Sequence, residues 1–158
     1  MIRLVKFKNI SEQDLDKIIN KHYTHWKQFS DQMNLEDTVY KFKNLYVDDK
    51  ELPIGYAFYD DDKLIGFCTL KKEELAKYNQ YTPWICSVMI FDEYRHQGYG
   101  SKMIELISNE VKTLGYNTVY LWTDQAPEFY EKIGFSFLQP VEKDDGSYGR
   151  MYYKKLVK

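Results

Sequence analysis

One stretch of the sequence decides the fold: Val88-Met89-Ile90-Phe91-Asp92-Glu93-Tyr94-Arg95-His96-Gln97-Gly98-Tyr99-Gly100-Ser101. An apolar run ends at Phe91, an acidic turn follows, and two glycines, Gly98 and Gly100, open an amphipathic helix. At a helix start the free N–H groups point outward and the helix dipole favours an anion. A glycine lets the backbone approach a phosphate without a Cβ in the way, and Arg95 can add a charge-assisted contact. The stretch therefore predicts a strand, a turn and a helix that cradle a pyrophosphate.

Two better-known phosphate-binding motifs do not fit this stretch. A P-loop needs the order Gly-Lys-Ser/Thr, whereas Gly100 is followed by Ser101-Lys102. A dinucleotide-binding fingerprint needs a third glycine, and Met103 stands at that position. On the glycines alone, a helix that merely begins with glycines after a turn stays open as an alternative.

The hydrophobic pattern on both sides of this stretch predicts alternating strands and helices. Ser11 reads as the N-cap of a helix with apolar residues at helical spacing up to Trp26. The run 84–91 is too continuous for a half-exposed strand and predicts a buried one. Gly115 and Gly134 are expected to close two helices. The expected strands are 2–8, 54–59, 64–70, 84–91, 118–123, 135–138 and 151–157, and the expected helices are the Ser11 helix, 35–46, 100–114 and 128–132.

The element order is therefore β-α-α-β-β-β-α-β-α-β-β. This order predicts an α/β or α+β fold, a mixed sheet with helices on both sides. Because no linker, repeat or low-complexity segment divides the chain, we expect a single domain over residues 1–158.

Composition excludes several classes of protein. The charge of -2, from 24 acidic and 22 basic residues, argues against a dedicated nucleic-acid binder. With 44% hydrophobic residues, the chain can build a core. Cys68 and Cys86 lie in apolar runs and are expected to be buried free thiols. Because no Cys–His zinc spacing occurs, no metal site is expected.

The N-terminal residues lack the layout of a signal peptide. No apolar run approaches the roughly 20 residues of a membrane helix. We therefore expect a cytoplasmic protein that does not enter a membrane.

Three motifs in this chain resemble a known family. Arg95-His96-Gln97-Gly98-Tyr99-Gly100 resembles the Gln/Arg-x-x-Gly-x-Gly/Ala signature of the GCN5-related N-acetyltransferase (GNAT) superfamily. The segment Ala126–Phe135 is similar to its Phe-Tyr-x-x-x-Gly-Phe block, and Asp62–Phe67 is similar to its second and third strands. The resemblance covers about residues 54–138 and, more loosely, the whole chain.

The resemblance implies an acyl-CoA N-acyltransferase (GNAT) fold. This is a mixed, mostly antiparallel twisted sheet of about six or seven strands with about four helices. It also implies acetyl-CoA as cosubstrate and an amine of a small molecule or peptide as acceptor. In the family, CoA enters a gap where the central strand and the next one splay apart. By position, the cofactor-binding residues would be the backbone of Val88, Met89 and Ile90, the amides of Arg95, His96, Gln97, Gly98, Tyr99, Gly100 and Ser101, and Thr123, which stands where many members have asparagine.

The reaction implied is direct attack of a neutral amine on the thioester. Tyr130 matches the family tyrosine that protonates the leaving thiolate, and a phenol with a pKa of about 10 suits that role. Histone-type members place a glutamate base where this chain has Trp84. Proton removal is then left to water or to another residue, with the candidates Glu73, Glu74, His22 and His25.

The acceptor side is less clearly marked. Trp84, Trp26 and Tyr81 are candidate substrate-binding residues, although Trp84 and Trp26 could instead be core residues. A non-catalytic acyl-CoA sensor is the alternative function, and a homodimer is left open.

Overall fold

A computed structural model describes residues 1–156 of the chain. Its first elements are β1 (Ile2–Lys6), the 3-10 turn η1 (Phe7–Asn9), α1 (Glu12–Lys27), α2 (Leu35–Tyr40), the π-helical turn η2 (Lys41–Leu45), β2 (Ile54–Asp60) and β3 (Lys63–Lys71). There follow η3 (Ala76–Tyr78), β4 (Trp84–Ile90), η4 (Asp92–Tyr94), α3 (Tyr99–Thr113), β5 (Thr118–Thr123), α4 (Pro127–Lys132), β6 (Ser136–Glu142) and β7 (Tyr148–Lys155).

The chain falls into two compact units, each built from two segments. Unit 1 contains Met1–Leu70 and Ser87–Leu106, and unit 2 contains Lys71–Cys86 and the described residues from Ile107 onward. Both β4 and α3 therefore begin in one unit and end in the other. The single domain expected over the whole length stays a prediction.

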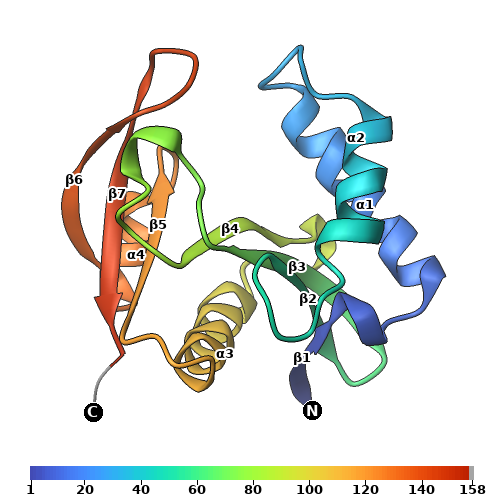
Figure 1. Cartoon of the computed structure of the whole chain (residues 1–158). Helices are drawn as coiled ribbons and strands as arrows, with labels where there is room; N and C mark the ends of the chain where they lie inside the picture. Colours follow the sequence, from blue (N-terminus) through green and yellow to red (C-terminus); the bar gives the residue numbers. More distant parts are fainter. Residues whose placement is uncertain (157–158) are drawn as a thin grey trace. The chain divides into compact units, whose positions relative to one another are not determined.

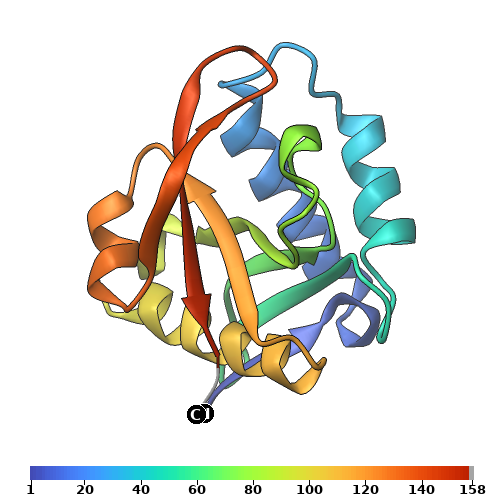
Figure 2. The same ribbon diagram turned by 60° about the vertical axis from the view of Figure 1, so that its left-hand side comes forward.

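The strands follow the hydrogen-bonded order β1-β2-β3-β4-β5-β7-β6. In unit 1, β1 pairs with β2 and β2 with β3, both antiparallel. In unit 2, β4 and β5 are parallel at Trp84 and Tyr120, and β5, β7 and β6 are antiparallel neighbours that lie side by side in Figures 1 and 2. Residues 1–156 form a mixed, mostly antiparallel sheet of seven strands together with four α-helices. This confirms the expected fold class.

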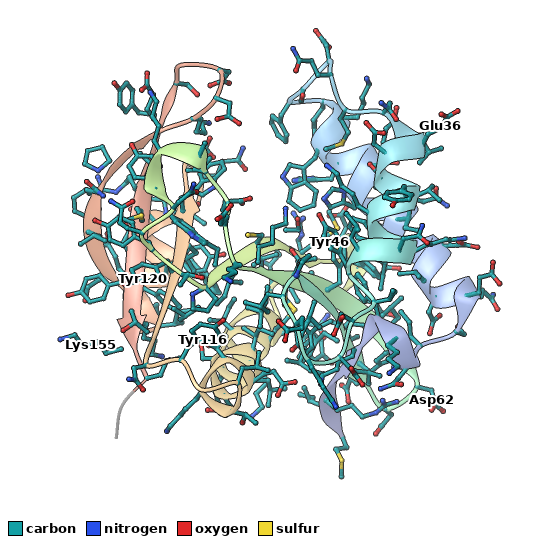
Figure 3. All side chains as sticks on the ribbon, in the orientation of Figure 1. Glu36, Tyr46, Asp62, Tyr116, Tyr120 and Lys155 are labelled. Atoms are coloured by element: carbon teal, nitrogen blue, oxygen red, sulfur yellow. The ribbon has the colours of Figure 1, made fainter. Side chains whose placement is uncertain are left out.

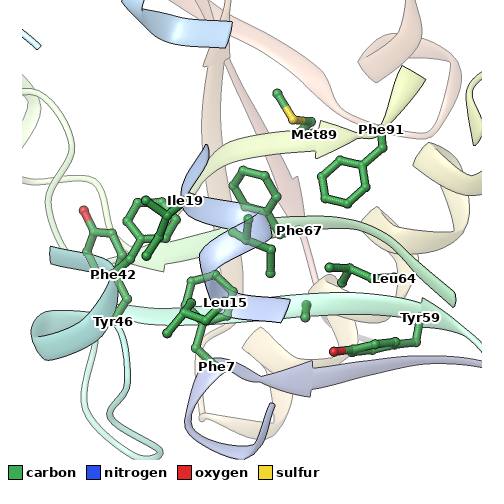
Figure 4. Close-up of a cluster of buried hydrophobic side chains, with 12 residues drawn as sticks. Phe7, Leu15, Ile19, Phe42, Tyr46, Tyr59, Leu64, Phe67, Met89 and Phe91 are labelled. Carbon is green, nitrogen blue, oxygen red and sulfur yellow. The ribbon is translucent and has the colours of Figure 1, made fainter. Parts of the chain in front are cut away.

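Unit 1 is organised around α1, which lies beside α2 (Figure 1). The Ser11 hydroxyl accepts a hydrogen bond from the Asp14 N–H at 3.1 Å, as expected of an N-cap. The buried face of α1 carries Leu15, Ile18 and Ile19. These side chains pack in one cluster with Phe42 of η2, Phe67 of β3 and Met89 of β4 (Figure 4). Its labelled members are Phe7, Leu15, Ile19, Phe42, Tyr46, Tyr59, Leu64, Phe67, Met89 and Phe91.

Unit 2 has its own buried cluster, made by Leu75, Trp84, Cys86, Val141 and Met151. Tyr120, labelled on β5 in Figure 3, packs against this cluster. Cys68 in unit 1 and Cys86 in unit 2 are both buried and form no disulfide, as the sequence predicts.

The first strand is shorter than the predicted 2–8, because Phe7 and Lys8 belong to η1. The ring of Phe7 lies so close to Gly55 that a Cβ added there would come within 2.1 Å of it. The chain turns at Phe7 so that its side chain enters the core over this glycine, and the alternation of the local sequence does not encode that contact.

Three other boundaries also differ from expectation. The predicted helix 35–46 is α2 followed by the wider turn η2. The last two strands are β6, which continues to Glu142, and β7, which starts at Tyr148. Pro140 argues against a central strand, but β6 is at the edge of the sheet, where a proline is tolerated. Residue 157 of the predicted last strand lies outside the described residues.

Candidate functional site

The glycine-containing turn of unit 1 has the form that the sequence predicts. After β4 and η4, the backbone is extended at Arg95 and left-handed at His96 (φ 65°) and Gly98 (φ 82°). The helix α3 then begins at Tyr99. A Cβ at Gly98 would meet no atom within 4 Å, so the glycine is required by its backbone conformation and the space beside it is open.

The first turn of α3 presents N–H groups that can bind an anion. The N–H of Lys102 donates to the carbonyl of Gly98 at 3.3 Å. The N–H groups of Tyr99, Gly100 and Ser101 precede this bond and belong to the set that lacks acceptors inside a helix. Together with the helix dipole they make a site suited to a phosphate.

Arg95 is held at the end of β4. Its Nε donates to the carbonyl of Ile90 at 3.1 Å and lies 3.4 Å from Asp92 Oδ1. Since a guanidinium carries five N–H donors, the others stay available for an anion. The side chain is half exposed, so an anion can reach it from solvent.

The start of α3 is tied to the end of β2. The Tyr99 hydroxyl donates to Asp60 Oδ2 at 2.6 Å, and this bond raises the pKa of Tyr99. The Tyr99 ring also packs edge-on against Phe58 and Tyr94. These contacts position the first N–H groups of the helix.

The middle of β4 is irregular, a feature that the sequence interpretation missed. Ser87 has φ of 53°, a left-handed conformation that is uncommon for a residue other than glycine. Its hydroxyl lies 3.3 Å from Nε2 of His22 on α1. Ser87 and Val88 are partly exposed, whereas the three residues before them are buried. The one signal in the sequence is a serine inside an otherwise apolar run.

Trp26 and the histidines of α1 form an aromatic group in unit 1. The Trp26 ring lies 4.6 Å from the ring of His22 and 4.6 Å from that of His25. Trp26 is partly buried against the core cluster, so its proposed contact with substrate stays a prediction. Burial lowers the pKa of His25, Arg95 lowers it further, and Asp92 opposes both.

In unit 2, Trp84 is fully buried and its indole N–H donates to the carbonyl of Tyr81 at 2.7 Å. Tyr81 is half-buried, its ring lies 5.2 Å from that of Tyr120, and its hydroxyl accepts from Gln139 at 3.4 Å. The sequence left Trp84 open as a substrate-binding residue or a core residue, and its burial and its hydrogen bond are typical of a core residue. Substrate binding by Trp84 and Tyr81 stays a prediction.

Tyr130 lies on α4 and is 8% exposed. Its ring packs edge-on against Phe129 and Phe135, which fixes its direction. Thr123, at the end of β5, accepts hydrogen bonds from the N–H groups of Gln125 at 3.3 Å and Ala126 at 3.0 Å. Its hydroxyl thus stabilises the turn into α4, and its contact with a cofactor stays a prediction.

Residues 1–156 contain no group of three or more His, Cys, Asp or Glu that could hold a metal ion. Within the same range, no helix has the length and apolar character needed to cross a membrane.

Solved structures share this fold. Aminoglycoside acetyltransferase AAC(6')-Ib, in complex with coenzyme A and kanamycin, has a TM-score of 0.76 at 16% identity, covering 98% of this chain and 95% of that one. Aminoglycoside 6'-acetyltransferase type Ii has a TM-score of 0.74 at 19% identity, covering 100% of this chain and 98% of that one.

Sequence comparison points the same way. The uncharacterized N-acetyltransferase CgeE of Bacillus subtilis (strain 168) is 28% identical over 122 residues. The match covers 69% of this chain and 46% of CgeE, so the chain spans about half the length of this curated relative. The profile of the Acetyltransferase (GNAT) family matches residues 15–135, from within α1 to the residue before β6. Because this match covers most of the chain, the chain belongs to the GNAT family of acetyltransferases.

Proposed function

We propose that this chain transfers an acetyl group from acetyl-CoA directly to the primary amine of a small molecule or peptide. The observation that carries the proposal is the turn before α3. It combines a left-handed glycine with open space beside it, helix N–H groups and an anchored arginine. Family membership supplies the reaction class.

The cosubstrate would be held mainly by backbone atoms. The N–H groups of residues 99–101 would bind its pyrophosphate, with Arg95 alongside, and the backbone of residues 88–90 would pair with its pantetheine and acetyl portions. Bound acetyl-CoA supplies a thioester whose carbonyl carbon accepts the amine nitrogen. These assignments follow the family resemblance and are compatible with the open space at Gly98.

The chain's own groups would then act at two atoms. The N–H groups of Met89 and Ile90 are the proposed donors to the oxygen that becomes negative as the amine attacks. The Tyr130 hydroxyl is the proposed acid that gives a proton to the leaving sulfur. Its ring is fixed by Phe129 and Phe135, as a proton donor to one defined atom requires.

A small-molecule amine is the acceptor to test first. The fold is that of aminoglycoside acetyltransferases, one of which was solved with kanamycin. At this level of identity the similarity selects compounds for a test and does not name the substrate.

The test is calorimetric titration with acetyl-CoA, followed by release of free thiol over a panel of kanamycin, polyamines, amino acids and short peptides. We expect saturable binding and thiol release that depends on one class of amine. Binding without thiol release on any amine would favour a non-catalytic acyl-CoA sensor. Absence of binding would overturn the proposal.

A further inference from the structure

The middle of β4 combines a polar side chain, a strained backbone and partial exposure. Ser87 has φ of 53°, and it lies with Val88 in a partly exposed step of a strand that is otherwise largely buried. A non-glycine residue in this conformation costs about 1–3 kcal/mol and persists where the surrounding structure holds it, often at functional sites. Ser87 is therefore a strained polar residue at a partly exposed position of the strand.

Behind Ser87 lies a titratable group that is fixed in place. The Ser87 hydroxyl is 3.3 Å from Nε2 of His22, a residue that is 9% exposed. The rings of Trp26, Phe42 and Phe67 surround the imidazole at centroid distances of 4.6, 4.8 and 6.0 Å. In the tautomer that carries its proton on Nδ1, Nε2 accepts the Ser87 O–H.

We propose that Ser87 and His22 form a proton relay that deprotonates the acceptor amine, with Ser87 as the residue that contacts the amine and His22 as the residue that acts through it. This inference rests on the proposed acetyltransferase function. Histone-type members of the family have a glutamate base at the position of Trp84. Because a tryptophan accepts no proton, the role of the base is open in this chain, and the relay would fill it.

The other candidates are placed less well for this role. Glu73 is exposed, and Glu74 lies 3.7 Å from the Lys71 ammonium. His25 is on α1 like His22, but its electrostatic partners are Arg95 and Asp92. Ser87 and His22 are thus the pair in which a titratable nitrogen lies next to the partly exposed step of β4.

The protons balance as follows. An N–H bond of the bound ammonium breaks and its proton goes to Ser87 Oγ, while the Ser87 O–H proton goes to His22 Nε2. The neutral nitrogen then forms the N–C bond and the S–C bond breaks. The nitrogen releases its second proton to solvent, and solvent returns a proton to the Tyr130 phenolate that remains after Tyr130 has protonated the sulfur. After product release, His22 returns its proton through Ser87 to solvent.

Three elements pack aromatic rings on His22: α1 with Trp26, η2 with Phe42 and β3 with Phe67. The titratable groups that contact these rings are Tyr46 on Phe42 and His25 on Trp26. Lys17 and Lys21 both lie over Phe91, a ring that packs against Phe67.

The test compares the pH dependence of kcat in wild type, His22→Gln and Ser87→Gly, at saturating acetyl-CoA and the best amine of the panel. Glycine suits the left-handed backbone, so Ser87→Gly removes the hydroxyl without adding strain. In wild type, kcat should fall as the pH drops through the range in which His22 gains a proton, because protonated His22 accepts no further proton. Both variants should lose about 100-fold at pH 7. The loss should shrink to about threefold near the amine pKa of about 10, where about half of the amine is neutral without the relay.

His25→Gln is the matched control, since it removes an imidazole from the same helix. We expect its kcat–pH profile to follow that of wild type. If His25→Gln shifts the acidic limb, or if either relay variant loses activity by the same factor at every pH, the relay is wrong. Acetyl-CoA binding by calorimetry should be unchanged in all three variants.

A second readout needs no turnover. The imidazole signals can be followed by NMR through a pH titration and assigned with His22→Gln and His25→Gln. Ser87→Gly should move the midpoint of the His22 signal and leave that of His25 in place. An unchanged His22 midpoint would overturn the pairing. An amine panel without any thiol release from wild type would instead count against the proposed function, and the relay would fall with it.

Discussion

The two halves of β4 differ in exposure and in backbone conformation although they are continuous in sequence. Trp84–Cys86, in unit 2, is buried, and the Trp84 indole N–H is bonded to the Tyr81 carbonyl. Ser87–Ile90, in unit 1, starts with a left-handed serine and is followed by the turn with the anchored Arg95. The first half packs in the core of unit 2, whereas the second half combines the partly exposed Ser87 and Val88 with Met89, which packs in the core cluster of unit 1. The change from a fully buried to a partly exposed strand therefore falls at Ser87.

The largest expected effect lies in the first half. Trp84→Ala removes a fully buried side chain, which typically costs about 3–5 kcal/mol in the free energy of unfolding. Trp26→Ala removes a partly buried tryptophan and should cost clearly less. Denaturant unfolding of both variants measures the difference. Equal losses would mean that Trp84 is not a main support of its core.

Tyr130 tests whether burial always means a structural role. It is 8% exposed, like a core residue, yet it is the proposed acid. Tyr130→Phe keeps the ring and removes the hydroxyl. We expect turnover to fall about 100-fold while acetyl-CoA affinity stays nearly unchanged. Thiol release and calorimetry check this, and full activity in the variant would remove Tyr130 from the mechanism.

Ser87 should behave in the opposite way to Trp84. Because glycine adopts a positive φ readily, Ser87→Gly should change the free energy of unfolding by only about 1 kcal/mol or less. Urea unfolding of Ser87→Gly beside Trp84→Ala compares the two halves directly. A loss for Ser87→Gly as large as that for Trp84→Ala would show that the second half is also structural.

The smallest expected effect concerns His25. Its pKa is lowered in the folded protein, so the unfolded chain binds a proton at a higher pH than the folded one. Protonation of His25 therefore favours the unfolded chain, and the free energy of unfolding decreases as pH falls through about 6.5, the pKa of a free imidazole. His25→Gln should lose less stability than wild type between about pH 7 and 5. Thermal unfolding at several pH values measures this, and a steeper loss in the variant would contradict it.

Much of the fold could be predicted because its signals are local. The apolar run at 84–91, the Ser11 cap and the closing Gly115 each lie in the element that they define or within two residues of it. The turn with Gly98 was predicted for the same reason, since a glycine at positive φ before a helix is a local feature.

The features that the sequence did not predict depend on contacts between residues that are far apart in sequence. Ser87 and His22 are separated by 65 positions, and the left-handed backbone of Ser87 has no signature in its neighbours. The turn at Phe7 depends on the absence of a side chain at Gly55. The Thr123 hydroxyl could be assigned to the turn before α4 only once the backbone path was known.

The central claim is that the turn before α3 binds the pyrophosphate of acetyl-CoA, and two glycines of positive φ provide the most direct measurement. Gly98 (φ 82°) precedes α3 and Gly115 (φ 100°) follows it, and a Cβ at either would meet no atom within 4 Å. Alanine at each adds similar backbone strain. Calorimetric titration with acetyl-CoA should show affinity at least about tenfold weaker for Gly98→Ala, since one misplaced anion contact is worth about 1.4 kcal/mol or more. Gly115→Ala should bind like wild type. Equal affinities for Gly98→Ala and wild type would contradict the claim.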